Sequence, residues 1–135
     1  MKGNVRSLNY YIDKPVEALM QEYGAFFAFS NKQYEEKAVE GITYARLVGG
    51  LVIPKYNAES FLECYTAIYE EGIAKRIEDS SIKDIIWYEL GNYEVQLTGD
   101  LTDVIEALHD YPITEEQIRN EYPDYFQMCI DNDYF

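Results

Sequence analysis

The sequence predicts an α+β fold in which about five helices pack around a small sheet of two to four strands. Two kinds of pattern support this prediction. Several segments repeat apolar residues every three or four positions, as in helices with one buried face. Shorter runs are rich in aromatic and β-branched residues, as in strands. At 135 residues the chain is expected to form one acidic domain over 1–135, with a possible N-terminal arm at 1–14.

Helix signals recur through the first half of the chain. Pro15 suits the first turn of one helix, and Ser30 is placed to cap a second. Asn57 is expected to cap the strongest helix, over 58–71, because apolar residues recur there at helical spacing. Gly72 follows and is expected to kink or end this helix.

Three segments are expected to supply the strands. Residues 26–29 are a compact aromatic run, and residues 44–53 are apolar and β-branched around Gly49-Gly50. The glycine pair allows either one strand or two short strands with a bulge or tight turn at the glycines. Residues 93–97 alternate apolar and polar side chains, as in a half-buried strand.

The stretch from 81 to 110 places a helix, a strand and a second helix in succession. Ser81 begins a capping-box-like pattern that starts the first helix, and Gly91-Asn92 is expected to end it. Asp100 follows the expected strand and is placed to cap the second helix.

A further helix is expected at 115–122. Thr114 and Gln117 form a T-x-x-Q capping box, in which each side chain bonds the backbone N–H of the other residue. Pro123 is expected to end this helix, and Asp124 to cap a last turn.

Negative charge is concentrated in the second half of the chain. The sequence has 25 acidic and 11 basic residues, for a formal net charge of −14. Residues 1–67 are nearly balanced, whereas residues 68–135 hold seventeen acids against four bases. After Lys83 only Arg119 is basic. Such an imbalance disfavours direct binding to nucleic acid or to an anionic membrane and attracts cationic partners.

This asymmetry favours a non-enzymatic, acidic protein-binding module that engages a basic partner through its C-terminal half. An extreme form is a DNA mimic, which presents carboxylates at the charge density of a duplex. Simple solubility is the alternative explanation. The expected acidic face consists of Asp103, Glu106, Asp110, Glu115 and Glu116.

The alternative class of function is a small metal-dependent enzyme. Glu89, Asn92, Glu94 and Asp100 lie where a helix end is expected to lead into a strand, so several oxygen atoms can converge there. Mg²⁺ or Ca²⁺ prefers such oxygens, and the three carboxylates are the expected ligands. The spacing matches no EF-hand loop, and Asn92 and Asp100 are also expected to end and to cap helices.

The single histidine and the two cysteines form no recognisable catalytic pattern. His109 has no serine or cysteine partner that would suggest a nucleophilic triad. Cys64 and Cys129 lack metal-ligand spacing and are expected to be buried, unpaired thiols in an intracellular protein.

The sequence suggests neither export nor membrane insertion. No signal-peptide core is present in the N-terminal residues, MKGNVRSLNYY, and no apolar run approaches the roughly 20 residues that cross a bilayer. The protein is therefore expected to be cytoplasmic. The exposed edge of a small sheet allows a homodimer, and a monomer remains the alternative.

Three separated pieces of the sequence share a further pattern: FFAFSNKQYEE at 26–36, GG...IPK at 49–55 and ELGNYEVQLTGD at 89–100. Together they resemble a family of small uncharacterised bacterial domains found in phages and mobile elements. In that family the last piece reads E-L-x-N-H-E followed by T-G-D, and Tyr93 stands here in place of the histidine. The resemblance implies no established activity. Any metal-ligand or proton-shuttle role of that histidine does not carry over to Tyr93.

Overall fold

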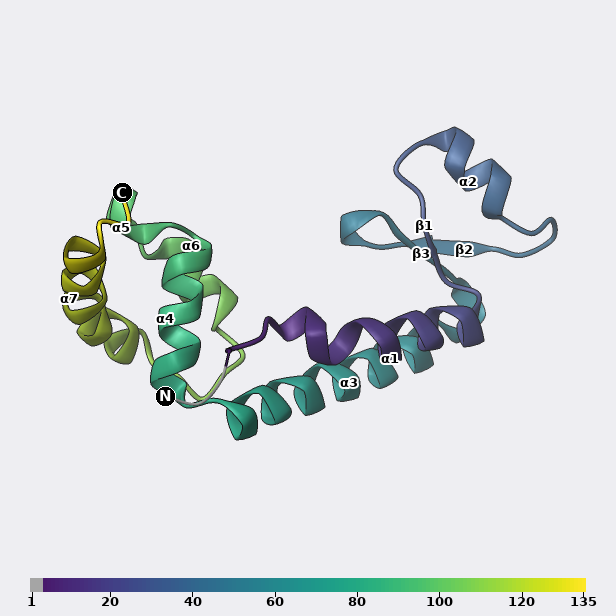
Figure 1. Cartoon of the computed structure of the whole chain (residues 1–135). Coiled ribbons are helices and arrows are strands. Elements are labelled where there is room, and N and C mark those ends of the chain that lie inside the picture. Colours follow the sequence, from purple (N-terminus) through teal and green to yellow (C-terminus); the bar gives the residue numbers. More distant parts are fainter. Residues whose placement is uncertain (1–3) are drawn as a thin grey trace. The chain divides into compact units, whose positions relative to one another are not determined.

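The computed structural model describes residues 4–135 and confirms the α+β class. Its described residues form seven α-helices and a three-stranded antiparallel sheet (Figure 1). They divide into two compact units. Unit 2 is Leu8–Gly72, and the described part of unit 1 is residues 4–7 with Ile73–Phe135. The sheet belongs entirely to unit 2, and the regular structure described in unit 1 is helical.

Helix α1 (Leu8–Tyr23) begins before Pro15, so the predicted helix start is wrong and half of the expected arm is helical. Proline has no backbone N–H and costs the helix interior a hydrogen bond. Ile12 and Leu19 are both buried on one face of α1, and this burial opposes the cost of the proline. Residues 1–3 of the expected arm lie outside the described residues.

The sheet has the strand order β1-β3-β2, with both neighbouring pairs antiparallel. Its strands are β1 (Phe26–Phe27), β2 (Tyr44–Arg46) and β3 (Leu51–Pro54). Of the two alternatives at the glycine pair, the structure has two short strands joined by a tight turn. Gly49 and Gly50 have φ values of 83° and 81°, in the left-handed region that glycine adopts at little cost.

Helix α2 (Asn31–Lys37) begins after Ser30, as predicted. The Ser30 Oγ accepts a hydrogen bond from the Gln33 backbone N–H at 3.2 Å. The Gln33 Oε1 in turn accepts one from the Phe29 N–H at 2.7 Å. These bonds satisfy amides at the helix start that have no partner within the helix.

Helix α3 (Ala58–Asp79) continues through Gly72, so the expected kink or end at this glycine is wrong. A Cβ atom at Gly72 would lie only 2.4 Å from Cγ2 of Ile12, so the glycine permits the close approach of α1. Asn57 is not the cap that the sequence suggested. Its Nδ2 donates to the Tyr23 carbonyl at 3.4 Å, and its Oδ1 has no hydrogen-bond partner among the described residues.

The core of unit 2 lies where α1, α3 and β3 meet. Leu19, Ile53 and Phe61 form its buried cluster. Partly buried apolar residues pack around this cluster: Met20, Tyr23, Ala25, Leu47, Leu51, Ala58, Cys64, Tyr65 and Ile68. The fully buried core of this unit is therefore small, and much of its apolar surface is only partly covered.

Helix α4 (Ile82–Asn92) confirms the first helix predicted for the central stretch. The Ser81 Oγ accepts a hydrogen bond from the Asp84 N–H at 3.0 Å. The helix ends at Gly91-Asn92, as expected. Its buried residues are Ile85, Ile86, Glu89 and Leu90.

The strand predicted at 93–97 is wrong, because Val95–Thr98 form the one-turn helix α5. Glu94 has a left-handed backbone with φ of 50°, which turns the chain directly after α4. The central apolar residue of the alternating pattern is buried, whereas Tyr93 and Leu97 are 40% and 55% exposed. The alternation therefore does not correspond to a buried face.

Helix α7 (Glu115–Asn132) begins with the capping box that the sequence predicted. The Thr114 Oγ1 accepts from the Gln117 N–H at 3.1 Å, and Gln117 Oε1 accepts from the Thr114 N–H at 2.7 Å. Pro123 lies inside this helix, so the predicted end at Pro123 and the predicted cap at Asp124 are both wrong. The buried residues Ile118, Tyr125 and Cys129 extend past the proline.

Helix α4 is central to unit 1, because it contacts α5, α6 (Thr102–Ala107) and α7. The helices bury aliphatic side chains from each of these segments and from the loops between them. These residues are Ile85, Ile86, Leu90, Val95, Leu101, Val104, Leu108, Ile113 and Ile118. This packing fixes the positions of the acidic segments that follow α5.

Candidate functional site

The acidic face occupies α6, the loop that follows it and the first turn of α7. Its five residues, Asp103, Glu106, Asp110, Glu115 and Glu116, are all exposed. In α6 the buried Val104 lies next to Asp103 and holds this helix against the core. The amphipathic pattern of the sequence thus places these carboxylates in water.

Two members of the acidic face contact a basic side chain. Glu115 Oε1 accepts two hydrogen bonds from Arg119, at 2.6 Å from Nη2 and 3.2 Å from Nε. Asp110 Oδ1 lies 3.4 Å from Nδ1 of His109, and both side chains are largely exposed. Among the described residues, no ion pair involves the other three carboxylates.

The surface charge of unit 1 is strongly unbalanced. Residues 73–135 contain fifteen acidic and four basic side chains. Arg76 is buried against Glu89, and Arg119 is engaged by Glu115. The other basic residues described in this unit, Arg6, Lys75 and Lys83, are too few to balance its remaining acidic groups, so a large negative potential surrounds this unit.

The three proposed metal ligands lie in different environments. Glu89 is buried and pairs with Arg76, whereas Glu94 and Asp100 are exposed. In the part of the chain that the structure describes, no group of three or more His, Cys, Asp or Glu side chains is arranged to hold a metal ion. The structure therefore does not bring these three carboxylates together, and cation binding stays a prediction from sequence alone.

Asp100 has a local structural role close to the one predicted for it. Its Oδ1 accepts hydrogen bonds from Thr102, at 2.7 Å from Oγ1 and 2.9 Å from the backbone N. These two bonds favour the ionised carboxylate and lower the pKa of Asp100 below its usual value. The start of α6 thus gains an oxygen acceptor for a first-turn amide.

A buried arginine joins three segments of unit 1 and was not anticipated from the sequence. Arg76 Nη1 donates to Glu89 Oε2 at 3.1 Å and to the Tyr111 hydroxyl at 2.9 Å. Its Nε donates to the carbonyl of Arg6 at 2.8 Å. Glu89 also accepts from Asn92 at 3.3 Å through its second oxygen. These bonds make the arginine cluster a structural connection, although Nη2 of Arg76 is buried without a hydrogen-bond partner among the described residues.

The position of Arg76 on α3 was a usable signal for its burial. Ile73, Arg76 and Ser80 follow one another at helical spacing and are all buried. Burial also raises the pKa of Tyr111, although the adjacent Arg76 opposes this rise. An arginine on an apolar stripe therefore indicated a buried partner carboxylate.

The remaining reactive side chains show no catalytic arrangement in the described residues. His109 is exposed and contacts only the neighbouring Asp110 through its ring. Cys64 and Cys129 are both free, and Cys129 is fully buried. Both thiols are unpaired, as expected, but Cys64 is only partly buried, so the expected burial holds for Cys129 alone.

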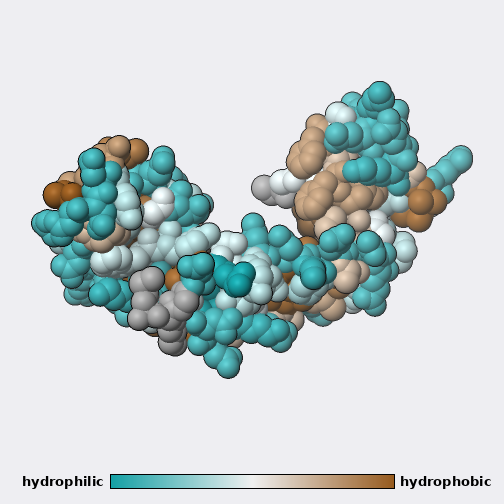
Figure 2. Space-filling model, in the orientation of Figure 1, coloured by the Kyte–Doolittle hydropathy of each residue, from teal (hydrophilic) through white to brown (hydrophobic). Residues whose placement is uncertain are grey.

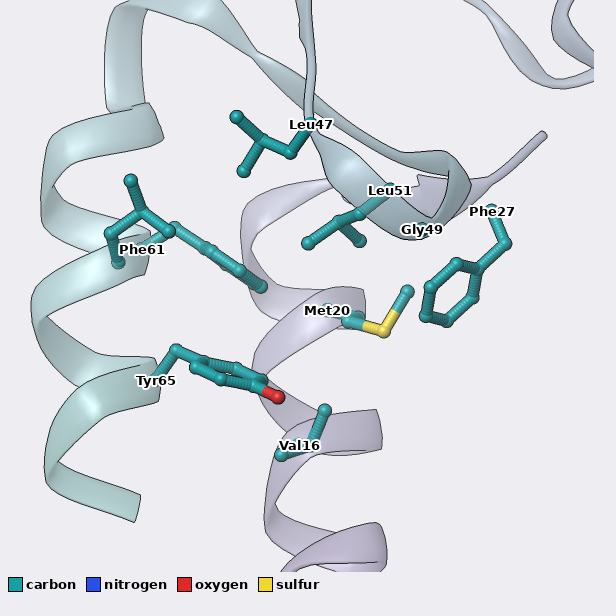
Figure 3. Close-up of a pocket in the computed structure, with 9 residues that line it drawn as sticks. Val16, Met20, Phe27, Leu47, Gly49, Leu51, Phe61 and Tyr65 are labelled. Atoms are coloured by element: carbon teal, nitrogen blue, oxygen red, sulfur yellow. The ribbon is translucent and has the colours of Figure 1, made fainter. Parts of the chain in front are cut away.

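Unit 2 contains an apolar cavity of about 460 Å³ between α1, α3 and the sheet (Figure 3). Met20 and Val16 face it from α1, and Tyr65 faces it from α3. The full lining is Val16, Met20, Phe27, Leu47, Gly49, Leu51, Phe61, Leu62 and Tyr65. Phe61, Leu62 and Tyr65 are among the apolar residues at helical spacing in 58–71 that predict a buried stripe. The structure shows that this stripe leaves an open space.

No helix among the described residues combines the length and the apolarity needed to cross a bilayer.

The chain belongs to a family of unknown function (DUF7659), whose model matches residues 8–128. The match covers both units and most of the acidic half. No curated protein and no solved structure matches the chain.

Proposed function

We propose that this member of a family of unknown function is a non-enzymatic, acidic protein-binding module. Its C-terminal half engages a basic partner through the acidic face. The protein acts in the cytoplasm of a bacterium and is associated with a phage or another mobile element. The observation that supports this proposal is the exposure of all five carboxylates of the acidic face in a unit where acidic residues far outnumber basic ones.

Charge of this kind acts mainly on the rate and the selectivity of association. Exposed carboxylates steer a basic partner during encounter and repel acidic competitors. Each exposed ion pair contributes only up to about 1 kcal/mol, so several pairs must form together for stable binding. Binding through the acidic face should therefore weaken steeply as salt is added.

Affinity capture from a bacterial lysate tests this proposal. The baits are the wild-type chain and a variant with Asp103→Asn, Glu106→Gln, Glu115→Gln and Glu116→Gln. A matched control removes four exposed carboxylates of unit 2 by Glu35→Gln, Glu36→Gln, Glu40→Gln and Glu70→Gln. Each bait is used at low and at moderate salt.

The expected result is one basic protein that the wild type and the control recover and the acidic-face variant loses. Moderate salt should reduce its recovery, because solvent-exposed charges are screened. Equal recovery by the acidic-face variant would show that the acidic face is only a solvated surface. Thermal unfolding followed by circular dichroism verifies that all three baits are folded.

A further inference from the structure

The apolar cavity of unit 2 continues along α1 into a second space of about 630 Å³. The two spaces share four lining residues: Val16, Met20, Phe27 and Tyr65. Along α1 the lining extends from Asn9 to Gln21, which corresponds to about 18 Å of helix. Together they form one groove, here called the α1 groove.

The α1 groove has apolar walls that remain open to solvent. Phe27 and Leu62 line it and are 43% and 42% exposed. Phe29 stacks in parallel on Phe27 with ring centroids 6.2 Å apart and extends the apolar surface. Figure 2 shows hydrophobic surface over the strands of this unit. Met20 adds an adaptable side chain to the wall, which suits the binding of varied apolar groups.

Carboxylates border the α1 groove along both of its helices. Asp13 and Glu17 line the second space on α1. Glu59 and Glu63 lie beside Leu62 on α3, where they line a shallower depression that shares this leucine. All four are exposed, and none of the described residues that line the three spaces is basic.

This combination of an apolar floor and an acidic border selects the chemistry of the occupant. An anionic lipid surface or a nucleic acid would be repelled by the border. A second copy of the chain carries a net charge of −14 and would be disfavoured for the same reason. A segment with an apolar face flanked by Lys and Arg satisfies both features.

The length of the groove favours a helical occupant. An amphipathic helix of three turns presents apolar side chains at positions i, i+4 and i+7 and spans about 16 Å. This length matches the lined part of α1. Basic residues on the flanks of such a helix would then lie beside the carboxylates of α1 and α3.

We propose that the α1 groove binds the apolar face of a basic amphipathic helix from a protein partner. Apolar side chains of that helix occupy the space lined by Met20, Phe61 and Tyr65. Its Lys and Arg residues pair with Asp13, Glu17, Glu59 and Glu63. This site is formed by unit 2 alone and does not depend on the acidic face of unit 1.

Isothermal titration of the full chain with a synthetic peptide tests the proposal. The probe is a peptide of about 14 residues, built from Leu and Lys so that all Leu residues share one helical face. One comparison peptide has the same composition in an order that spreads Leu around the helix. A second contains Glu in place of Lys. Only the amphipathic basic peptide should bind.

Substitutions in the α1 groove separate the contributions of apolar and charged side chains to peptide affinity. Leu62→Gln should weaken binding about tenfold, because it removes apolar surface at an exposed position with little effect on folding. Leu97→Gln, at an exposed position of α5, is the matched control and should leave affinity unchanged. Neutralising Asp13, Glu17, Glu59 and Glu63 to Asn or Gln should also weaken binding about tenfold at low salt.

Methionine methyl resonances locate the bound peptide. Met20 lines the groove, whereas Met128 lies on α7 in unit 1. Peptide addition should shift the Met20 methyl signal and leave the Met128 signal in place. A shift of Met128 alone would overturn the proposal.

Other outcomes of the titration would also overturn it. Equal binding of the peptide with dispersed Leu residues would show that no helical face is recognised. Loss of binding in the acidic-face variant but not in the variant with a neutralised groove border would assign the peptide to unit 1. Conversely, capture experiments can fail for the acidic face while the groove still binds the peptide, so the two proposals fail separately.

Discussion

The two units differ in the kind of exception that each makes to ordinary burial. Unit 1 buries a charged cluster, in which Arg76 bonds Glu89 and Tyr111, and exposes carboxylates. Unit 2 leaves apolar side chains such as Phe27 and Leu62 partly exposed around a groove. Buried polar groups and exposed apolar patches are the informative departures from the usual distribution. The buried charged cluster of unit 1 is structural, whereas the exposed apolar side chains of unit 2 indicate a binding surface.

Removal of the Arg76 side chain should have the largest effect on stability. Arg76→Ala leaves Glu89 buried without its cation, and such losses cost about 3–5 kcal/mol. Urea unfolding followed by Trp87 fluorescence measures this loss, because the only Trp packs against Tyr125 in unit 1. The double variant Arg76→Met with Glu89→Leu should lose less, since no unpaired charge remains. A loss below about 1 kcal/mol in the single variant would contradict a structural role for the arginine cluster.

A cavity in the core of unit 2 tests whether the chain unfolds as one domain. Phe61→Ala should cost about 3 kcal/mol, because the ring is fully buried. Helix α3 runs without interruption from unit 2 into unit 1, so we expect both units to unfold in one transition. The measurement compares Trp87 fluorescence with circular dichroism in the same urea titration. Separate midpoints for the two signals would show that the units are independent domains.

Two glycines provide a matched comparison between the units. Gly72→Ala should destabilise the protein by about 1–2 kcal/mol, because its Cβ would meet Ile12 at 2.4 Å. Gly91→Ala, in α4, meets only the Tyr125 hydroxyl at 3.4 Å and should stabilise by up to about 1 kcal/mol. Thermal unfolding gives both values. If both substitutions changed stability in the same direction, helix propensity rather than the close approach of α1 would determine the change at Gly72.

The smallest expected effect concerns the carboxylate of Asp100. Because its pKa is lowered in the folded state, its contribution to stability is present above the unfolded pKa and is lost as the pH falls through the folded value. Thr102→Val removes the hydroxyl donor and should raise this pKa toward 3.8. An NMR titration of the Asp100 side chain in both proteins measures the change. An unchanged pKa would assign the lowering to the Thr102 backbone N–H alone.

Local signals predicted three helix caps correctly and the effects of two prolines incorrectly. Ser30, Ser81 and Thr114 all cap helices as expected, because a cap depends on hydrogen bonds within four residues. Pro15 and Pro123 lie inside helices that were expected to start or end there. Burial on both sides of each proline offsets the lost hydrogen bond, and this burial comes from other segments.

The two candidate sites differ in the same way, because the sequence predicted the acidic face but not the α1 groove. The charge asymmetry of the sequence predicted the acidic face, and the structure exposes all five of its carboxylates. The α1 groove was not predicted, since apolar residues at helical spacing indicate a buried face whether or not that face is completely covered. The burial of Glu89 was also missed, because its partner lies on a different helix.

The sequence by itself determined the α+β class, the helix caps at Ser30, Ser81 and Thr114, the glycine-rich turn in the sheet and the acidic surface. These features depend on hydrogen bonds, backbone preferences and charges that are local in the chain. The tertiary structure decided that the segment after α4 is a helical turn, that α3 passes through Gly72, and that Arg76 pairs with Glu89. Each of these depends on which distant segment lies opposite, so contacts between segments override local propensity.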